Sequence, residues 1–255
     1  MTENNDTNDV PVAFSIIGAG RFGTFFGRHL SQHFPVSFFD INPSRKEYVS
    51  SFSNWLPLKE CLTKDFIFLT IPIRQMENFM RENSPRIKPG SVIMDCASVK
   101  LAVQRWFHQY LPAQVFFASC HPLFGPDSAK RELTGQKITL QPGRIPYSKF
   151  RFIVELMTEM LKLEVLSIAA EEHDKLMAYN LSLIHHLGRT FNDLHIYKLS
   201  LMMAGLERIS EISDVVMNDS IELFHDFYHF NPFAREVENK FLEIFKNLSP
   251  AHDNE

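Results

Sequence analysis

The stretch VAFSIIGAGRFG, residues 12–23, decides the fold that this chain is expected to adopt. Its first half is a short apolar run typical of a buried strand, and its second half has the spacing Gly-x-Gly-x-x-Gly. Apolar residues at helical spacing follow up to residue 30. A strand, a tight turn and a helix in this order predict a dinucleotide-binding unit. In such a unit Gly18 makes the turn, Gly20 lets a pyrophosphate approach the backbone, and Gly23 packs the helix against the strand.

Apolar runs further along the chain continue this alternation of strands and helices. The expected strands are residues 12–17, 36–39, 66–70, 91–95 and 115–118, with 138–141 and 164–167 as edge strands. Their pattern predicts an α/β fold with a doubly wound, mostly parallel Rossmann-type sheet. From Glu171 to about Leu248 only helical periodicity remains, so a smaller all-helical domain is expected to follow.

The change of pattern places a domain boundary near Ala169. We expect a disordered tail over residues 1–10, a dinucleotide-binding domain over 11–169, a helical domain over 170–248 and a frayed tail over 249–255. The first ten residues lack the apolar run of a signal peptide, and no run reaches the length of a membrane span.

The composition favours a globular protein with a small-molecule partner. The chain has 255 residues, of which 45% are hydrophobic, enough for a genuine core. Its net charge is −4 and its basic residues are scattered, which argues against nucleic acid or an anionic membrane as partner. Three cysteines without a CxxC pair argue against a disulfide scaffold and favour reduced thiols in the cytoplasm.

Asp40 ends the second predicted strand, where a carboxylate can bind both hydroxyls of the adenosine ribose. A carboxylate also repels a 2′-phosphate, so Asp40 favours NAD over NADP. NADP stays open, because Ser44, Arg45 and Lys46 follow closely and can neutralise a phosphate. The complete set of expected cofactor-binding residues is Gly18, Gly20, Arg21, Phe22, Gly23, Asp40 and Thr70.

Two later strand ends carry the expected catalytic side chains. The sequence DCASVK occupies residues 95–100, and HPLFGPDS occupies residues 121–128. Because the carboxyl ends of parallel strands line the ligand crevice, Ser98 and His121 should converge where the nicotinamide lies. A histidine there can accept a proton near neutral pH. The alternative is that His121 does no more than end a strand before Pro122.

The octapeptide HPLFGPDS closely resembles the active-site loop of the prephenate and arogenate dehydrogenases, the NAD(P)-dependent enzymes of tyrosine biosynthesis. Residues 95–100 resemble the same family's Asp-x-x-Ser-Val-Lys element, and residues 172–174 with His185 resemble the start of its helical domain. Residues 205–231 resemble the last helices of the plant-like arogenate branch. The resemblance covers about residues 12–248, and its specificity comes from the whole set of motifs.

The helical domain has one apolar and one polar face when it is read at 100° per residue from Leu176. The apolar stripe, expected to pack, comprises Leu176, Leu183, Leu187, Phe191 and Leu194. Ser182, His185 and Arg189 lie opposite, facing either solvent or, as the resemblance implies, a substrate cleft. Arg208 matches the carboxylate-binding arginine of prephenate-using relatives, although its surrounding helix resembles the arogenate branch. Its alternative is an exposed helix arginine.

The resemblance implies oxidative decarboxylation of prephenate to 4-hydroxyphenylpyruvate, with His121 accepting the proton of the ring hydroxyl and Ser98 orienting that hydroxyl. His185, Arg208 and Ser182 would hold the substrate. Arogenate dehydrogenation to tyrosine and a non-catalytic dinucleotide sensor are the alternatives. The family pairs through its helical domain, so a cytoplasmic homodimer is expected. No metal site is expected.

Overall fold

The structure, a computed structural model, describes residues 11–129 and 132–248. The tails expected at residues 1–10 and 249–255 therefore lie outside the described residues. Contacts divide the chain into two compact units. The second unit consists of Pro72–Arg74, Ser98–Arg105 and the chain from Ile168 onward, and the first unit takes the rest. The two short segments of the second unit lie far upstream of Ala169, so a single boundary in the sequence does not describe this division.

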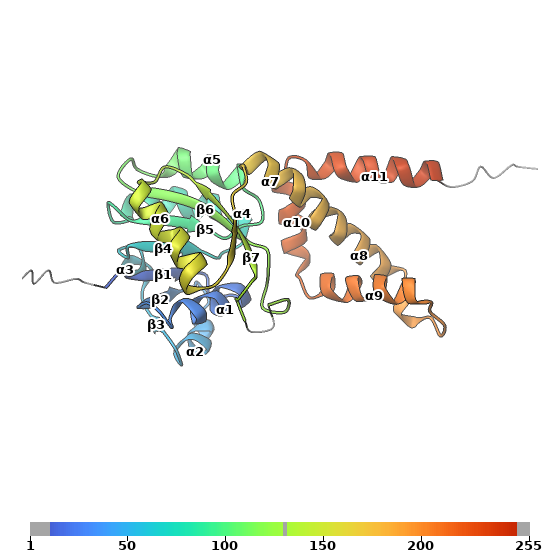
Figure 1. Ribbon diagram of the computed structural model, residues 1–255, viewed down its shortest axis with the longest axis horizontal. Coiled ribbons are helices and arrows are strands. Elements are labelled where there is room, and N and C mark those ends of the chain that lie inside the picture. Colours follow the sequence, from blue (N-terminus) through green and yellow to red (C-terminus); the bar gives the residue numbers. More distant parts are fainter. Residues whose placement is uncertain (1–10, 130–131, 249–255) are drawn as a thin grey trace, which may run out of the picture. The chain divides into compact units, whose positions relative to one another are not determined.

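Within the described residues, eight strands form one sheet in the order β3-β2-β1-β4-β5-β6-β7-β8 (Figure 1). The strands are β1 Phe14–Ile17, β2 Val36–Phe39, β3 Asn54–Trp55, β4 Phe66–Leu69, β5 Val92–Asp95, β6 Phe116–Pro122, β7 Lys137–Pro142 and β8 Glu164–Leu166. All neighbours are parallel except β6 and β7. The predicted doubly wound, mostly parallel sheet is confirmed, and its order reverses between β1 and β4, where such folds bind their ligands.

Two details of the sheet differ from the sequence-based expectation. β7 is not an edge strand, because it pairs with β6 on one side and with β8 on the other. It runs antiparallel to β6 because the described part of their connection forms turns rather than a crossover helix. β3 was not predicted, since two residues are too short to show a period of two.

Helices cover both faces of the sheet. They are α1 Arg21–Leu30, α2 Lys46–Val49, α3 Leu58–Cys61, α4 Ile73–Asn83, α5 Leu101–Tyr110 and α6 Tyr147–Glu155, with short 3₁₀ turns at Pro43–Arg45 and Ser84–Arg86 and a π-helical stretch at Leu156–Met160. The first residues of α4 and α5 belong to the second unit. Alternation along β1 shows the two faces. Phe14 packs with Phe152 of α6 at a ring distance of 6.4 Å, whereas the Ser15 hydroxyl donates to the carbonyl of Cys61 in α3.

The core on the α1 side of the sheet is built mainly from phenylalanine. Phe14 stacks on Phe66 with ring centroids 5.1 Å apart, and Phe26 of α1 meets Phe68 edge-on at 5.2 Å. Gly27 allows this close approach of α1, since a Cβ there would lie 2.1 Å from the Phe38 ring. The sheet therefore holds the start of α1, and with it the glycine turn, in a fixed place.

Helices make up the described part of the second unit from residue 170 onward. They are α7 Ala170–Met177, a π-helical stretch Ala178–Leu183, α8 Ile184–Asp193, a short turn Ile196–Lys198, α9 Ala204–Met217, α10 Ile221–Phe230 and α11 Ala234–Leu248. α9 packs closely on α8, because Gly188 leaves no room for a Cβ beside Val216 and the Ser213 hydroxyl donates to the Gly188 carbonyl at 2.7 Å. None of the described helices is long and apolar enough to span a membrane.

The buried face of α7 and α8 is not the one expected from the sequence. Ser182 and His185 are 1% and 3% exposed, whereas Leu176 and Leu194 of the predicted apolar stripe are 42% and 65% exposed. The cause is the π-helical stretch Ala178–Leu183, whose turns are wider than those of an α-helix, so the 100° step does not continue through it. Ser182 and His185 are therefore not solvent-exposed.

Candidate active site

The glycine turn lies between the end of β1 and the start of α1. Gly18 has φ +111°, and a Cβ there would lie 2.7 Å from the carbonyl oxygen of Thr70. Its amide donates to the carbonyl of Phe39 at 2.8 Å. At Gly20, by contrast, a Cβ would meet no atom of the described residues within 4 Å. The surface above Gly20 is therefore clear for an anionic ligand at the N-terminus of α1.

Thr70 and Gly23 both contact the backbone of the glycine turn at Gly18. The Thr70 hydroxyl donates to the carbonyl of Gly18 at 2.7 Å, and its amide donates to the carbonyl of Ile17 at 2.9 Å. A Cβ on Gly23 would come within 2.1 Å of the Gly18 carbonyl oxygen. Gly23 therefore lets α1 start directly against the turn, and Thr70 joins the turn to β4.

Asp40 is fixed at the end of β2 by both of its carboxylate oxygens. One accepts the amide of Ala19 at 2.7 Å, and the other accepts the amide of Asn42 at 2.8 Å. A carboxylate oxygen has capacity for a second donor, so ribose hydroxyls can still bind. The same contact with Ala19 ties Asp40 to the glycine turn. Together with the opening above Gly20, this arrangement fits a bound dinucleotide.

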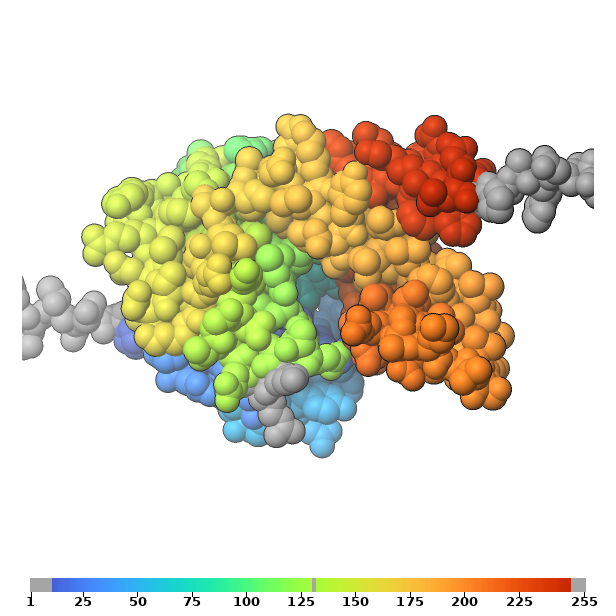
Figure 2. Space-filling model, turned by 45° about the vertical axis from the view of Figure 1, so that its right-hand side comes forward, coloured from blue at the N-terminus to red at the C-terminus, as the bar shows by residue number. Residues whose placement is uncertain are grey.

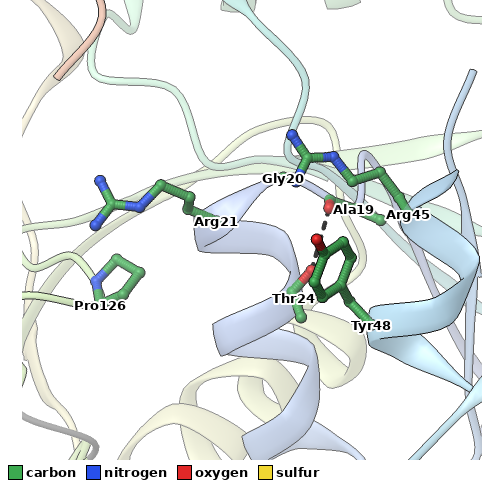
Figure 3. A pocket seen from close by; sticks show the side chains of 7 residues that line it. All are labelled: Ala19, Gly20, Arg21, Thr24, Arg45, Tyr48 and Pro126. Atoms are coloured by element: carbon green, nitrogen blue, oxygen red, sulfur yellow. Dashed lines mark hydrogen bonds between the residues drawn. The ribbon is translucent and has the colours of Figure 1, made fainter. Parts of the chain in front are cut away.

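A cavity of about 360 Å³ opens beside the turn (Figure 3). It is lined by Ala19, Gly20, Arg21, Thr24, Arg45, Tyr48 and Pro126. Arg45 and Tyr48 come from the segment after Asp40, and the Arg45 guanidinium lies over the Tyr48 ring, 5.9 Å from its centroid. Sequence reasoning treated Arg45 only as a possible phosphate partner and did not find Tyr48. The position of Tyr48 shortly after Asp40, the predicted ribose-binding residue, is the signal that was available.

The octapeptide of residues 121–128 lies against the glycine turn. Arg21, the first residue of α1, donates to both carboxylate oxygens of Asp127, at 2.7 and 2.6 Å. Phe124 packs beside Phe22 and Phe25 of α1, with ring centroids 6.2 and 6.4 Å apart. The ring of Phe22, a residue expected to bind the cofactor, therefore packs against the octapeptide.

His121 is near the carboxyl end of β6 and is 8% exposed. It is in register with Thr139 on β7, and the preceding Cys120 donates its thiol to the carbonyl of Asp95 at 3.0 Å. β6 is parallel to β5, so His121 lies at the sheet edge where the glycine turn also lies. A side chain so shielded from bulk water suits acceptance of a proton from a bound ligand.

Ser98 and Lys100 belong to the second unit, where Asp174 of α7 holds their loop. The fully buried Asp174 carboxylate accepts the amides of Lys100 and Leu101 at 2.8 and 2.9 Å, as a cap does at a helix N-terminus. His173 approaches the same carboxylate through Nδ1 at 2.9 Å. In the sequence, residues 172–174 were noted only for their resemblance to the start of the family's helical domain. Nothing there indicated that Asp174 accepts these two backbone amides.

His185 lies in an aromatic cluster of the second unit. Its ring stacks on Phe224 with centroids 5.8 Å apart, and its Nε2 is 3.5 Å from a carboxylate oxygen of Asp219. Arg189, one turn further along α8, contacts the same ring and the same aspartate. Its guanidinium lies 5.4 Å from the Phe224 centroid and donates to the Asp219 backbone carbonyl at 2.9 Å. Arg208 is exposed on α9, and no hydrogen bond or ion pair joins it to this cluster in the described part of the chain.

Comparison with known families finds a match for much of the first unit. Residues 42–161 match the family model described as "Prephenate dehydrogenase, nucleotide-binding domain". This segment is therefore similar to the nucleotide-binding domain of the prephenate dehydrogenases. The match includes Thr70, the loop of Ser98 and the whole octapeptide with His121.

Similar proteins extend the comparison over most of the chain. Arogenate dehydrogenase 1, chloroplastic, of Arabidopsis thaliana is 23% identical over 97% of this chain and 40% of its own length. The probable arogenate/prephenate dehydrogenase of Methanocaldococcus jannaschii is 26% identical over 95% of this chain and 57% of its own length. The chain thus spans about half the length of these relatives. The solved prephenate dehydrogenase of A. aeolicus, in complex with hydroxyphenyl propionate and NAD+, shares the fold, with a TM-score of 0.73, 19% identity, and coverage of 92% of this chain and 90% of that one.

The structure brings together most of the expected cofactor-binding residues. Gly18, Gly20, Arg21, Gly23, Asp40 and Thr70 all surround one turn. The expected substrate-binding residues divide differently. Ser182 and His185 are both buried in the second unit, whereas Arg208 is exposed on α9. The roles assigned to these residues stay predictions.

Proposed function

We propose that the chain is a dinucleotide-dependent dehydrogenase that converts prephenate to 4-hydroxyphenylpyruvate by oxidative decarboxylation. One observation carries the proposal: the octapeptide that bears His121 is paired through Asp127 to Arg21, at the start of the helix where a dinucleotide would bind. The family of the nucleotide-binding domain supports it. A sensor would need the glycine turn but no histidine at the same sheet edge.

The residues of the chain have separate tasks in this reaction. The turn at Gly20 and the carboxylate of Asp40 would hold the dinucleotide, and the bound group would supply the hydride acceptor for C4 of the substrate ring. Neutral His121 takes the proton of the hydroxyl on C4, and the ring carboxylate leaves as CO2, so the ring becomes aromatic. Ser98 orients this hydroxyl. His185, Arg208 and Ser182 hold the remainder of the substrate.

A spectrophotometric assay tests this proposal directly. Purified protein is mixed with prephenate or arogenate, each with NAD or NADP, and the absorbance of the reduced cofactor is followed. We expect reduction with prephenate and release of one CO2 for each cofactor reduced. Cofactor binding without reduction in all four mixtures would overturn the proposal and favour the sensor.

NAD is the proposed cofactor, on the strength of Asp40. Its two oxygens are held by Ala19 and Asn42, so the carboxylate is not free to turn away from a 2′-phosphate. Arg45 offers a compensating cation in the adjacent cavity. We therefore expect a higher kcat/KM with NAD, and we expect Arg45→Ala to widen the difference because it removes the cation that a phosphate would use.

Arogenate is the second candidate substrate, and Asp219 favours it. Arogenate carries an α-ammonium group that prephenate lacks, and a carboxylate beside His185 is suited to bind it. The Asp219 side chain is partly exposed, so it is accessible to a ligand. The ratio of kcat/KM for the two substrates decides between them, with arogenate favoured if Asp219 binds the ammonium.

A homodimer that pairs through the helical unit is also proposed. Large apolar side chains are exposed along the segment from the end of α8 through α9, which Figure 2 shows in orange at the surface. The most exposed of them are Leu194, Leu199, Leu201, Met203 and Val215. Light scattering should give twice the 29.6 kDa mass of one chain. A monomeric mass would contradict pairing; the cytoplasmic location stays a prediction.

A further inference from the structure

Two thiols meet where β5 and β6 end. Asp95 and Ser119 form the last register pair of these parallel strands, and each is followed by a cysteine, Cys96 and Cys120. The two sulfur atoms are 3.8 Å apart. Cys120 is fully buried, whereas Cys96 is partly exposed. Neither cysteine is in a disulfide, so the pair is in the dithiol form.

The backbone at this position suits a disulfide bond. Adjacent strands lie about 4.8 Å apart, which falls in the range of Cα separations, about 4.4–6.8 Å, found across disulfides. The sulfur atoms need to approach by roughly 1.8 Å to reach the bond length of about 2.05 Å. Rotation of Cys120 toward Cys96 would break the hydrogen bond from its thiol to the Asp95 carbonyl. The dithiol and disulfide forms therefore differ in how the two strand ends are joined.

We propose that Cys96 and Cys120 form a reversible disulfide, a redox-modification site that crosslinks the carboxyl ends of β5 and β6. A hydroperoxide is the oxidant. The more accessible Cys96 attacks one peroxide oxygen, the O–O bond breaks, and a sulfenic acid and a water (with hydrogen peroxide as oxidant) are formed. The Cys120 thiol then attacks the sulfenic sulfur, and a second water leaves as the S–S bond forms. In all, two thiols lose two electrons and two protons; a small dithiol reverses the change.

The consequence for turnover rests on the proposed function. His121 directly follows Cys120, so a bond at Cys120 acts one residue from the proposed proton acceptor. The crosslink also joins β6 to Cys96, which precedes the loop of Ser98 by two residues. Oxidation should therefore lower turnover while the chain stays folded, and reduction should restore it.

Mass spectrometry of the full chain tests the disulfide without reference to activity. Reduced protein is treated with a few equivalents of hydrogen peroxide, quenched, and measured intact and as non-reduced peptides. We expect a loss of about 2 Da and a peptide pair that joins Cys96 to Cys120, both reversed by dithiothreitol. The count of reactive thiols in the denatured protein should fall from three to one.

Cys61 provides the matched control. It lies in α3, and burial raises the pKa of its thiol to about 12. Cys61→Ser should form the crosslink as the parent does, whereas Cys96→Ser and Cys120→Ser should not. Should Cys120→Ser fail to fold, Cys96→Ser alone suffices, because its partly exposed position tolerates a hydroxyl. A mass gain of oxygen without a crosslink, or a crosslink to Cys61, would overturn the proposal.

Turnover is measured on the same samples. Peroxide should inactivate the parent and Cys61→Ser reversibly, and should spare Cys96→Ser. A crosslink in a protein that never reduces a cofactor contradicts the proposed function and leaves the disulfide standing. Turnover that is unaffected by a complete crosslink contradicts the proposed effect on His121.

Discussion

Arg21 donates to both carboxylate oxygens of Asp127, and so joins the first residue of α1 to the octapeptide that begins at the end of β6. Both side chains are more than half exposed, so the pair adds less than about 1 kcal/mol to the free energy of unfolding. Its importance is positional: it sets the distance between the dinucleotide turn and the segment that carries His121.

Breaking this pair should slow turnover more than it destabilises the protein. We expect Asp127→Asn and Arg21→Ala each to lower kcat by up to about fivefold, equivalent to about 1 kcal/mol, with little change in Tm. Because each change removes the same contact, the double variant should lose no more than either single variant. Additive losses in steady-state kinetics would show that the two residues act separately.

Replacement of His121 by Asn should affect the chemical step. We expect His121→Asn to lower kcat by about 10²–10⁴-fold with a much smaller change in KM, because proton acceptance is an interaction of the transition state. Dinucleotide binding, followed by fluorescence of the reduced cofactor, should be unchanged. An undiminished kcat would remove His121 from the mechanism.

Gly18 and Gly20 should respond differently to the same substitution. Gly18→Ala places a Cβ at φ +111° and against the Thr70 carbonyl, so we expect it to lower the free energy of unfolding by about 1–3 kcal/mol. Gly20→Ala meets open space and should leave stability nearly unchanged while weakening dinucleotide binding. Urea unfolding and cofactor titration of both variants provide the comparison. Equal loss of stability would contradict the assignment of Gly20 to the ligand.

Asp174 should be needed for stability, in contrast to acidic residues near it on the surface. We expect Asp174→Ala to lower the free energy of unfolding by about 1–3 kcal/mol, since it leaves the amides of Lys100 and Leu101 without their acceptor. Glu171→Ala removes only an exposed ion pair with Lys175 and should cost under about 1 kcal/mol. Urea unfolding measures both. Similar values for the two variants would mean that Asp174 is not a cap.

The features predicted correctly from the sequence are those that depend on neighbouring residues. The β1 run, the glycine turn and the alternation of strands with helices are local patterns, and the structure contains them where expected. The orientation of β7 depends on its connection, and the pairing of Arg21 with Asp127 joins residues 106 positions apart. Neither can be obtained from periodicity. The location of the octapeptide could be inferred because it resembles a family, not because its residues have a spacing of their own.

The error on α8 has a different origin, since the sequence contains no sign of the wider turn before it. A π-helical turn holds more residues than an α-helical turn, as though an extra residue had been inserted into Ala178–Leu183. Because the stretch takes up this residue in its wider turns, the faces of α8 lie about 100° from where an unbroken α-helical step places them. That step assigns the buried side of α8 to Leu187 and Phe191, whereas His185 occupies it. The wider turns before α8, rather than its own composition, thus select the side chain that Phe224 and Phe227 enclose.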